Sequence, residues 1–376
     1  MTLPSPVQEK IYTDATNYFE RIVDAIGQAQ RSVDLEVYIF DNDPLSARIS
    51  HALEQAAQRG VKVRVLTDGV GACSDFSQIA DQLIAAGAEV RIYHPLPWHL
   101  EHWRLSLTQS RGVEKFFTLF SYINKRDHRK LIIIDQKLAW LGSFNITQKH
   151  LPGEQDGENW RDTAIEITGL DLEAAQMAFD TCWFRRKQRK TVKRLPRTPF
   201  IFNFTHRLRT IQRKRLLKRI SRASDKIWIT NAYFVPDKQL LRALIYASYR
   251  QVDVRILLPK KSDIFFIPWA SSYFYRQLLD AGVRIFEYQQ RILHAKTIII
   301  DDWATIGSSN LNGRSLRHDL ELDYSLQLAE SKTTLRQHFL QDLEHAEELD
   351  AVSFEQKRSW QRWLGGLLLF FLSRWV

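Results

Sequence analysis

Cysteine is scarce in this sequence, and no segment of it is predicted to cross a membrane. The 376 residues contain two cysteines, Cys73 and Cys182, too few for a disulfide framework, so a reducing compartment is expected. Residues 1–10 hold no basic stretch followed by an apolar run, which argues against a cleaved signal peptide. The apolar run at residues 363–372 rises only about 15 Å as a helix, whereas a bilayer core is about 30 Å thick.

Acidic residues are absent from residues 181–224, in a chain whose net charge is +10. Sixteen Lys and Arg residues lie between Arg185 and Arg222. Such a segment is either a solvated linker or a patch that is attracted to phosphate groups. Nucleic acid and acidic lipid both fit this charge, so charge alone does not identify the partner.

The order of predicted elements occurs twice along the chain. In the first half, apolar strands and amphipathic helices are predicted to alternate at residues 33–40, 44–58, 61–67 and 89–93. In the second half, the same order is predicted at residues 226–230, 238–249, 252–258 and 283–287. Strands separated by helices favour parallel pairing. We therefore predict an α/β fold with two similar lobes, whose mixed, mainly parallel sheets are flanked by helices.

Each half also contains the same short motif, in which a His is followed by a Lys after two positions and by an Asp after seven. The two copies are His128, Lys130 and Asp135, and His294, Lys296 and Asp301. A Gly-Ser-x-Asn sequence follows each copy, with Ser143 and Asn145 in the first and Ser308 and Asn310 in the second. Alternate residues of a strand project to one face, so each His and its Lys are expected to point the same way. Two copies at equivalent places are far more specific than one.

With these motifs the sequence resembles the phospholipase D superfamily, and within it the bacterial cardiolipin synthases. Residues 231–237 and 37–41 are also similar to the corresponding segments of those enzymes, and the chain looks like the short members without N-terminal membrane spans. The resemblance implies two phospholipase D-like lobes with the active site at their interface. We expect them at residues 1–184 and 211–350, joined by a basic linker at 185–210 and followed by an amphipathic, membrane-associating tail at 351–376.

The resemblance also implies a mechanism without a cofactor or a metal ion. One His attacks phosphorus to form a phosphohistidine, while the other protonates the departing alcohol. Following the usual assignment in the family, we expect His128 to be the nucleophile and His294 the acid and base. Lys130 and Lys296 are expected to hold the non-bridging oxygens, which supplies the positive charge that a metal would otherwise provide.

The other candidate residues are expected to support these four. Ser143, Asn145, Ser308 and Asn310 can donate hydrogen bonds to the phosphate, and Asp162 and Glu321 can accept the second ring N–H of each His and fix its tautomer. Although Asp135 and Asp301 complete the signature, we expect them to be structural, because seven residues of strand span about 23 Å. Zinc at His94, His99 and His102 is not favoured, since a fourth ligand is lacking.

Aromatic and apolar segments favour a lipid substrate over nucleic acid. An insertion between Gly87 and His128 mixes Trp and Phe with Arg and Lys, which suits a bilayer interface but also single-stranded nucleic acid. Residues 264–275 are strongly apolar, as a core helix also would be. The apolar run within residues 360–376 is bracketed by Trp and Arg, which favours an interfacial anchor.

We therefore expect a phosphatidyltransferase that makes cardiolipin from phosphatidylglycerol and a second phospholipid. Phosphatidylglycerol and an anionic membrane surface are its expected partners, and no obligate protein partner is indicated. The expected location is the surface of the bacterial inner membrane, on its cytoplasmic face. Three alternatives stay open: a hydrolase with water as the acceptor, a metal-independent endonuclease on the same scaffold, and a membrane-binding protein with a vestigial site.

Overall fold

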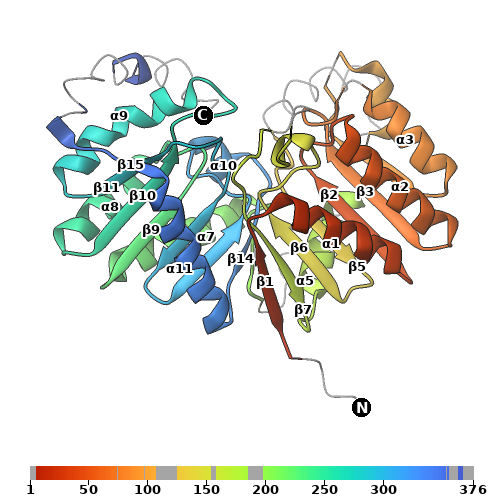
Figure 1. Cartoon of the computed structure of the whole chain (residues 1–376), viewed down its shortest axis with the longest axis horizontal. Helices are drawn as coiled ribbons and strands as arrows, with labels where there is room; N and C mark the ends of the chain where they lie inside the picture. The colour runs from red at the N-terminus through yellow and green to blue at the C-terminus, as the bar shows by residue number, and fades with distance from the viewer. Residues whose placement is uncertain are drawn as a thin grey trace.

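Two β-sheets with helices on their faces form the two lobes of the protein in a computed structural model (Figure 1). The structure describes residues 6–73, 75–96, 98–106, 125–153, 158–184, 198–352, 354 and 363–366. Most of the predicted tail and residues 185–197 of the predicted linker therefore lie outside the described residues. Among the helices that the structure does describe, none is long and apolar enough to cross a membrane.

The first lobe is built on a seven-stranded sheet with the strand order β1-β7-β6-β5-β2-β3-β4. Its strands are β1 (Gln8–Tyr12), β2 (Ser32–Val37), β3 (Lys62–Asp68), β4 (Glu89–Tyr93), β5 (Leu131–Ile134), β6 (Leu138–Gly142) and β7 (Ala164–Thr168). Its helices are α1 (Ala15–Gln28), α2 (Pro44–Gln58), α3 (Phe76–Ala85) and α5 (Glu173–Trp183), with short 3-10 turns at Leu100–Leu105 and Gln148–His150.

The second lobe is built on an eight-stranded sheet with the order β15-β11-β10-β9-β12-β13-β14-β8. Its strands are β8 (Phe200–Phe202), β9 (Lys226–Thr230), β10 (Asp253–Pro259), β11 (Arg284–Tyr288), β12 (Thr297–Ile300), β13 (Trp303–Gly307), β14 (Leu322–Ser325) and β15 (Ala346–Glu348). Its helices are α7 (His206–Arg222), α8 (Lys238–Tyr249), α9 (Ile267–Asp280), α10 (Gly313–Arg317) and α11 (Ala329–Glu344). Strand β8 lies within the predicted linker and pairs with β14.

The predicted α/β fold with two similar lobes and mixed sheets is confirmed, but the expectation of mainly parallel pairing is wrong. Only β2–β3 and β3–β4 are parallel in the first sheet, and only β9–β10 and β10–β11 in the second. The other pairs among the described strands are antiparallel. The reason is that each His-x-Lys motif leads into a tight hairpin, β5–β6 or β12–β13, whose strands reverse direction without a crossover helix.

Local signals set several helix boundaries where the sequence predicts them. The side chain of Asp43 accepts a hydrogen bond from the Ser46 N–H at 2.9 Å and starts α2, and Asp237 starts α8 in the same way. Gly87 and Gly282 have φ values of 101° and 84° just after α3 and α9. That left-handed conformation suits glycine and turns the chain into the next strand.

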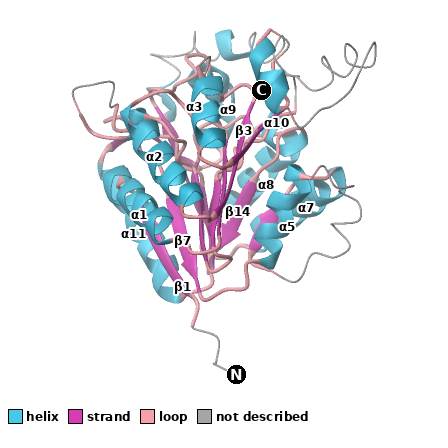
Figure 2. Cartoon of the chain, turned by 90° about the vertical axis from the view of Figure 1, so that its right-hand side faces the viewer, coloured by secondary structure: helices cyan, strands magenta, loops and turns pink. Residues whose placement is uncertain are grey.

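The two sheets pack together through one continuous hydrophobic cluster. Figure 2 shows the strands in the middle of the molecule with helices on both sides. Buried Ile133, Leu141 and Ile165 come from the first sheet, and Ile306 and Leu322 from the second. Burying one such side chain is worth about 1.5–3 kcal/mol. This shared core fixes the ends of β5 and β12 relative to each other, and the two His-x-Lys motifs lie at these ends.

Candidate active site

Each His-x-Lys segment lies directly before a strand of its own lobe and hydrogen-bonds to the other lobe. The His128 N–H donates to the Leu320 carbonyl at 3.0 Å, and the His294 N–H donates to the Arg161 carbonyl at 2.8 Å. The residue before each His, Asp127 or Leu293, forms a parallel β-bridge to the other lobe. The site is therefore assembled at the lobe interface, with one motif from each side.

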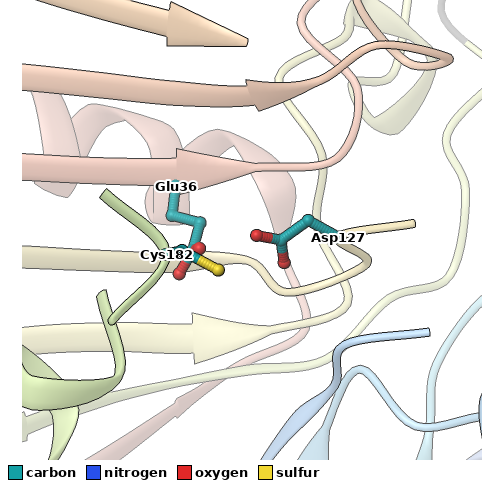
Figure 3. A group of neighbouring side chains, drawn as sticks. All are labelled: Glu36, Asp127 and Cys182. Carbon is teal, nitrogen blue, oxygen red and sulfur yellow. The ribbon is translucent and has the colours of Figure 1, made fainter. Parts of the chain in front are cut away.

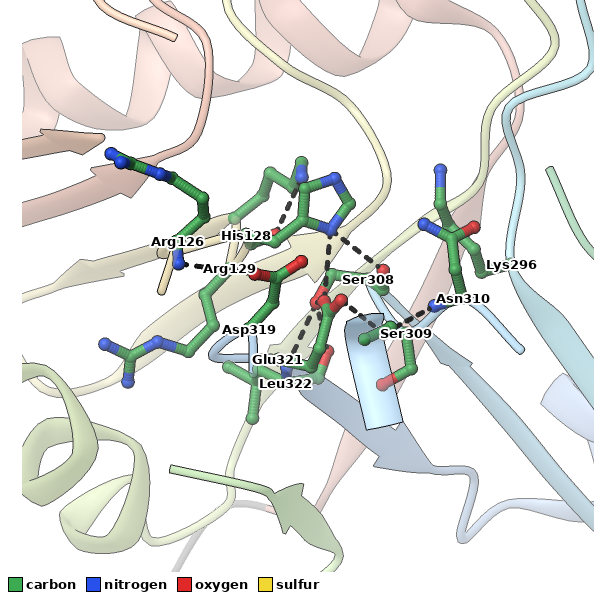
Figure 4. A network of polar contacts seen from close by, with 12 residues as sticks. Arg126, His128, Arg129, Lys296, Ser308, Ser309, Asn310, Asp319, Glu321 and Leu322 are labelled. Atoms are coloured by element: carbon green, nitrogen blue, oxygen red, sulfur yellow. Dashed lines mark hydrogen bonds and ion pairs between the residues drawn. The ribbon is translucent and has the colours of Figure 1, made fainter. Parts of the chain in front are cut away.

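His128 is buried, and its ring is held by the second lobe (Figure 4). Nδ1 lies 3.1 Å from Oε2 of Glu321 and 3.2 Å from the carbonyl oxygen of Ser308. A carbonyl oxygen only accepts hydrogen bonds, so Nδ1 carries the hydrogen. In the neutral ring, Nε2 then keeps its lone pair and is the nitrogen available to react.

His294 is held by the first lobe, through Asp162 and, behind Asp162, through His150. Its Nδ1 lies 2.8 Å from Oδ1 of Asp162. The other oxygen of Asp162 lies 2.9 Å from Nδ1 of His150, which is fully buried. Nε2 of His150 accepts a hydrogen bond from the Asn145 N–H at 3.0 Å. Because Nε2 accepts this bond, the hydrogen of a neutral His150 lies on Nδ1, the nitrogen that faces Asp162. The Asp162 carboxylate is therefore placed between the imidazole rings of His294 and His150.

In the second lobe a serine stands at the position of His150. The Asn310 N–H donates to Oγ of Ser315 at 3.0 Å, and this hydroxyl donates to Oε1 of Glu321 at 2.5 Å. Sequence reasoning missed both His150 and Ser315. The available signal was their spacing, because each lies five residues after the Asn of its Gly-Ser-x-Asn sequence.

Lys130 and Lys296 are both buried at the site, each beneath a tyrosine that sequence reasoning also missed. Lys130 Nζ lies 5.2 Å from the ring centre of Tyr38 and donates to the His128 carbonyl at 2.7 Å. Lys296 Nζ lies 5.9 Å from the ring centre of Tyr233 and donates to the His294 carbonyl. Burial lowers the pKa of Lys130 to about 7, helped by the charge of Lys296, and lowers the pKa of Lys296 to about 8.

The two histidines differ in their electrostatic surroundings. Burial and the charges of Lys130, Lys296 and His294 hold the pKa of His128 well below its usual range. Burial and Lys296 also lower the pKa of His294, but there the charge of Asp162 opposes the shift.

Their carboxylate partners differ as well. Burial alone would raise the pKa of Asp162, yet His294 and His150 outweigh it and hold that pKa well below the usual range. Burial raises the pKa of Glu321 to about 7, against the opposing charge of Lys130. Asp162 is therefore a permanent anion near neutral pH, whereas Glu321 titrates there.

The amides and hydroxyls of the two Gly-Ser-x-Asn sequences have different tasks. Oδ1 of Asn145 accepts from the Ile39 N–H at 3.2 Å, and Oδ1 of Asn310 accepts from the Tyr233 N–H at 3.3 Å. These bonds orient each amide. The Ser143 hydroxyl donates to the Thr163 carbonyl at 3.2 Å, and the Ser308 hydroxyl donates to Glu321 at 2.5 Å. Both hydroxyls are thus engaged by groups of the protein, whereas we expected them to donate to the phosphate.

Asp135 and Asp301 lie at the far ends of β5 and β12, away from the histidines. Asp135 accepts the backbone N–H groups of residues 30–32 at 2.7–3.0 Å. Asp301 accepts those of residues 224–226 at 3.0–3.1 Å. Each carboxylate therefore ties its hairpin to the first residues of the neighbouring strand.

A second buried cluster lies behind the first motif and has the composition of a metal site. Glu36, Asp127 and Cys182 point toward one another (Figure 3). The Arg129 guanidinium lies among them and donates to Glu36 at 2.5 Å, to both oxygens of Asp127 at 3.0 Å and to Cys182 Sγ at 2.8 Å. Its fixed positive charge occupies the place of a cation. Arg129 separates His128 from Lys130 in sequence, so this cluster anchors the backbone of the motif.

The fold and this duplicated site define an enzyme of the phospholipase D superfamily. The model of the family described as "Cardiolipin synthase, PLD-like domain" matches the chain at residues 22–161 and 216–343. The chain belongs to this family and is a cardiolipin synthase-like phosphatidyltransferase.

Similar proteins agree with this family, and one solved structure shares the fold. The cardiolipin synthase of Geobacillus thermodenitrificans (strain NG80-2) is 31% identical over 363 residues, covering 93% of this chain and 69% of that protein. That of Clostridium perfringens (strain SM101) is 30% identical over 364 residues, covering 92% and 72%. Phosphatidylserine synthase of Haemophilus influenzae has a similar fold, with a TM-score of 0.70 at 12% identity over 97% of this chain and 94% of that one.

Proposed function

We propose that this enzyme makes cardiolipin by transferring a phosphatidyl group from one phospholipid to a hydroxyl group of phosphatidylglycerol. The observation that carries the proposal is the crosswise pairing of two buried histidines with carboxylates of the opposite lobe, 3.1 Å apart in one pair and 2.8 Å in the other. Two buried lysines add positive charge beside them. Two histidines in different states can serve as nucleophile and acid, and the lysines can stabilise a phosphorane-like transition state.

In the first step, Nε2 of His128 attacks phosphorus and the bond from phosphorus to the departing alcohol oxygen breaks. His294 donates its proton to that oxygen, so the alcohol leaves neutral. Lys130 and Lys296 hold the non-bridging oxygens, and the oriented amides of Asn145 and Asn310 donate to them. The product of this step is a phosphatidyl-histidine together with a neutral His294.

In the second step, phosphatidylglycerol takes the place of the departed alcohol. Neutral His294 accepts the proton of its hydroxyl group as the oxygen attacks phosphorus. The N–P bond to His128 then breaks, the new phosphodiester is released, and His294 is again protonated. Both protein groups return to their starting states, so the cycle balances without a co-reactant.

The surroundings of the two histidines support His128 as the nucleophile. A nucleophile must be neutral, and the pKa of His128 is held well below its usual range by burial and nearby cations. A general acid must hold a proton, and although burial also lowers the pKa of His294, the charge of Asp162, which is anionic near neutral pH, opposes that shift. The negative charge of a bound phosphodiester further favours protonation of His294. Asp135 and Asp301 are structural in this account.

We also propose that the enzyme works at the surface of the bacterial inner membrane, on its cytoplasmic face, as a peripheral protein. A net charge of +10 favours anionic lipid. Exposed Trp98, Phe265 and Trp363 suit a bilayer interface.

Lipid mass spectrometry after incubation with phosphatidylglycerol vesicles tests the proposed reaction. The native chain should form cardiolipin and release glycerol, and His128→Asn and His294→Asn should each abolish this. The exposed histidine of α2, changed as His51→Asn, is the matched control and should retain activity. Phosphatidic acid as the sole product would instead establish a hydrolase. Inert vesicles combined with cleavage of DNA in the presence of chelator would establish an endonuclease.

A further inference from the structure

A cavity of about 450 Å³ lies between helix α7 and the face of the second sheet that points away from the first lobe. Ile201, Ile298 and Trp303 from the sheet and Leu216 from the helix supply apolar lining. Its volume falls within the range of about 300–1,000 Å³ that is usual for small-molecule sites, and such sites combine apolar walls with a few polar groups. The proposed transfer reaction places no substrate in this cavity.

Four arginines of α7 line the cavity, and two of them are already engaged in the fold. Arg209 donates to the carbonyls of Arg317 and His318, each at 2.9 Å. Arg213 forms an ion pair with Asp237 at 2.6 Å. These two side chains attach α7 to the rest of the second lobe.

The other two arginines, Arg215 and Arg219, are exposed and lie one helical turn apart. Like charges at this spacing repel each other. Within the part of the chain that the structure describes, neither forms an ion pair with a carboxylate. The Arg219 guanidinium lies 4.4 Å from the ring centre of Trp303. Partial burial, and then the charge of Arg215, lower the pKa of Arg219. The helix thus places two uncompensated positive charges beside an apolar hollow.

We propose that this cavity binds an anionic amphiphile, with a phosphate or carboxylate head on Arg215 and Arg219 and one hydrocarbon chain over Ile298, Leu216 and Trp303. The head would relieve the repulsion between the two guanidinium groups and could be held by both. The chain would cover apolar side chains that otherwise line a hollow.

The position of the cavity gives this site a direct connection to the candidate active site. Its lining includes Ser309, Asn310 and Ser315. Asn310 carries one of the amides that we propose donate to the phosphate, and Ser315 donates to Glu321, which contacts His128. Asp323 also lines the cavity, with its two oxygens accepting from the N–H and hydroxyl of Ser309. A bound amphiphile would therefore contact the loop that supports the second half-site.

Calorimetric titration with dodecyl phosphate below its micelle concentration tests the site. The chain used should carry Lys296→Met, which weakens phosphate binding at the active site but leaves the cavity unchanged. We expect saturable binding that Arg215→Ala/Arg219→Ala weakens by about tenfold or more. Lys214→Ala/Lys218→Ala is the matched control, because these two lysines have the same helix, spacing and charge, are exposed and do not line the cavity. The lysine pair should change the affinity by less than about twofold.

Two further probes separate the head from the chain. Inorganic phosphate and the neutral dodecyl maltoside should both bind about tenfold more weakly than dodecyl phosphate, because each lacks one half of the ligand. Ser325→Phe, which fills part of the cavity, should weaken dodecyl phosphate and leave inorganic phosphate unchanged. Equal affinities for dodecyl phosphate and inorganic phosphate, or equal effects of the arginine and lysine pairs, would overturn the proposal. Because the readout is binding, either result leaves the proposed transfer reaction untouched.

Discussion

His150 and Ser315 occupy equivalent positions in the two half-sites but give their carboxylates different properties. His150 adds a second imidazole to Asp162, whose pKa stays well below its usual range although burial would raise it. Ser315 offers Glu321 only a hydroxyl, and burial raises the pKa of Glu321 to about 7. We infer that this difference separates the roles of the two histidines. The carboxylate that stays ionised, Asp162, contacts His294, which must hold a proton.

Replacing His150 by the residue of the other half-site tests this inference. His150→Ser should lower kcat by about tenfold, as is typical when a group that orients a first partner is lost. Without His150, burial should raise the pKa of Asp162 toward that of Glu321. A protonated Asp162 no longer stabilises the His294 imidazolium, so the pKa of His294 should fall and the alkaline limb of the kcat profile should move to lower pH. A purely structural role of His150 would reduce stability and kcat without moving that limb. Ser315→Ala, which leaves Asp162 intact, should not move it either.

The lowered pKa values of Lys130 and Lys296 predict how anion binding at the site depends on pH. Burial lowers the pKa of Lys130 to about 7 and that of Lys296 to about 8. As the pH rises from 6 to 9, the site loses positive charge, so inhibition by sulfate, whose own charge is constant there, should weaken. Lys296→Arg should make this dependence shallower, because a guanidinium stays protonated. A sulfate inhibition constant that is unchanged between pH 6 and 9 would contradict the lysine assignment.

At the scale of elements, the Asp at the end of each His-x-Lys motif attaches its hairpin to the neighbouring strand by hydrogen bonds. Asp135 directly follows β5 and receives the backbone N–H groups of residues 30–32, where β2 begins. Partial burial raises its pKa, but these N–H groups outweigh burial and lower it. The same balance applies to Asp301 at the end of β12.

Asp135→Asn should therefore reduce stability and leave the chemistry intact. We expect a loss of about 1–2 kcal/mol in the free energy of unfolding, comparable to the loss of a good helix cap. Because the folded pKa is lowered, this contribution is present above the unfolded value of about 3.9 and disappears as the pH falls through the folded pKa. Urea titrations at pH 7 and pH 3 measure the difference. Loss of kcat in the fully folded variant would contradict a structural role.

The sequence predicts elements well where the signal is local. Helices at residues 44–58 and 238–249 have the observed bounds, because capping aspartates and amphipathic patterns fix them. The two His-x-Lys copies likewise predict which side chains meet at the interface. The pairing between strands that are distant in sequence cannot be predicted from such local signals. The antiparallel hairpins, the return of β8 to β14 and the engagement of the Ser308 hydroxyl all depend on tertiary register, which local periodicity does not encode.

At the scale of the whole molecule, neither lobe contains a complete half-site. Glu321 of the second lobe serves His128, and Asp162 of the first serves His294. The hydrophobic cluster between the sheets maintains this exchange. Activity should therefore depend on an interface that lies well outside the site.

Ile165→Ala, in the shared cluster on β7, tests this coupling. Truncating a fully buried Ile should cost about 2–5 kcal/mol. Because the cluster belongs to both lobes, calorimetry should show a single unfolding transition at a lower temperature. Two resolved transitions, with only the first-lobe transition shifted, would show that the lobes are energetically independent.

The central claim is that His128 forms the covalent intermediate while His294 moves the proton. A phosphatidyl donor with a p-nitrophenolate leaving group tests it, because this leaving group departs without an acid. His294→Asn should release a burst of about one p-nitrophenolate per chain and then stall, since the acceptor is no longer deprotonated. Mass spectrometry of peptides should find the phosphatidyl group on His128, and His128→Asn should give no burst. A burst in His128→Asn, with the adduct on His294, would contradict the account and exchange the two roles.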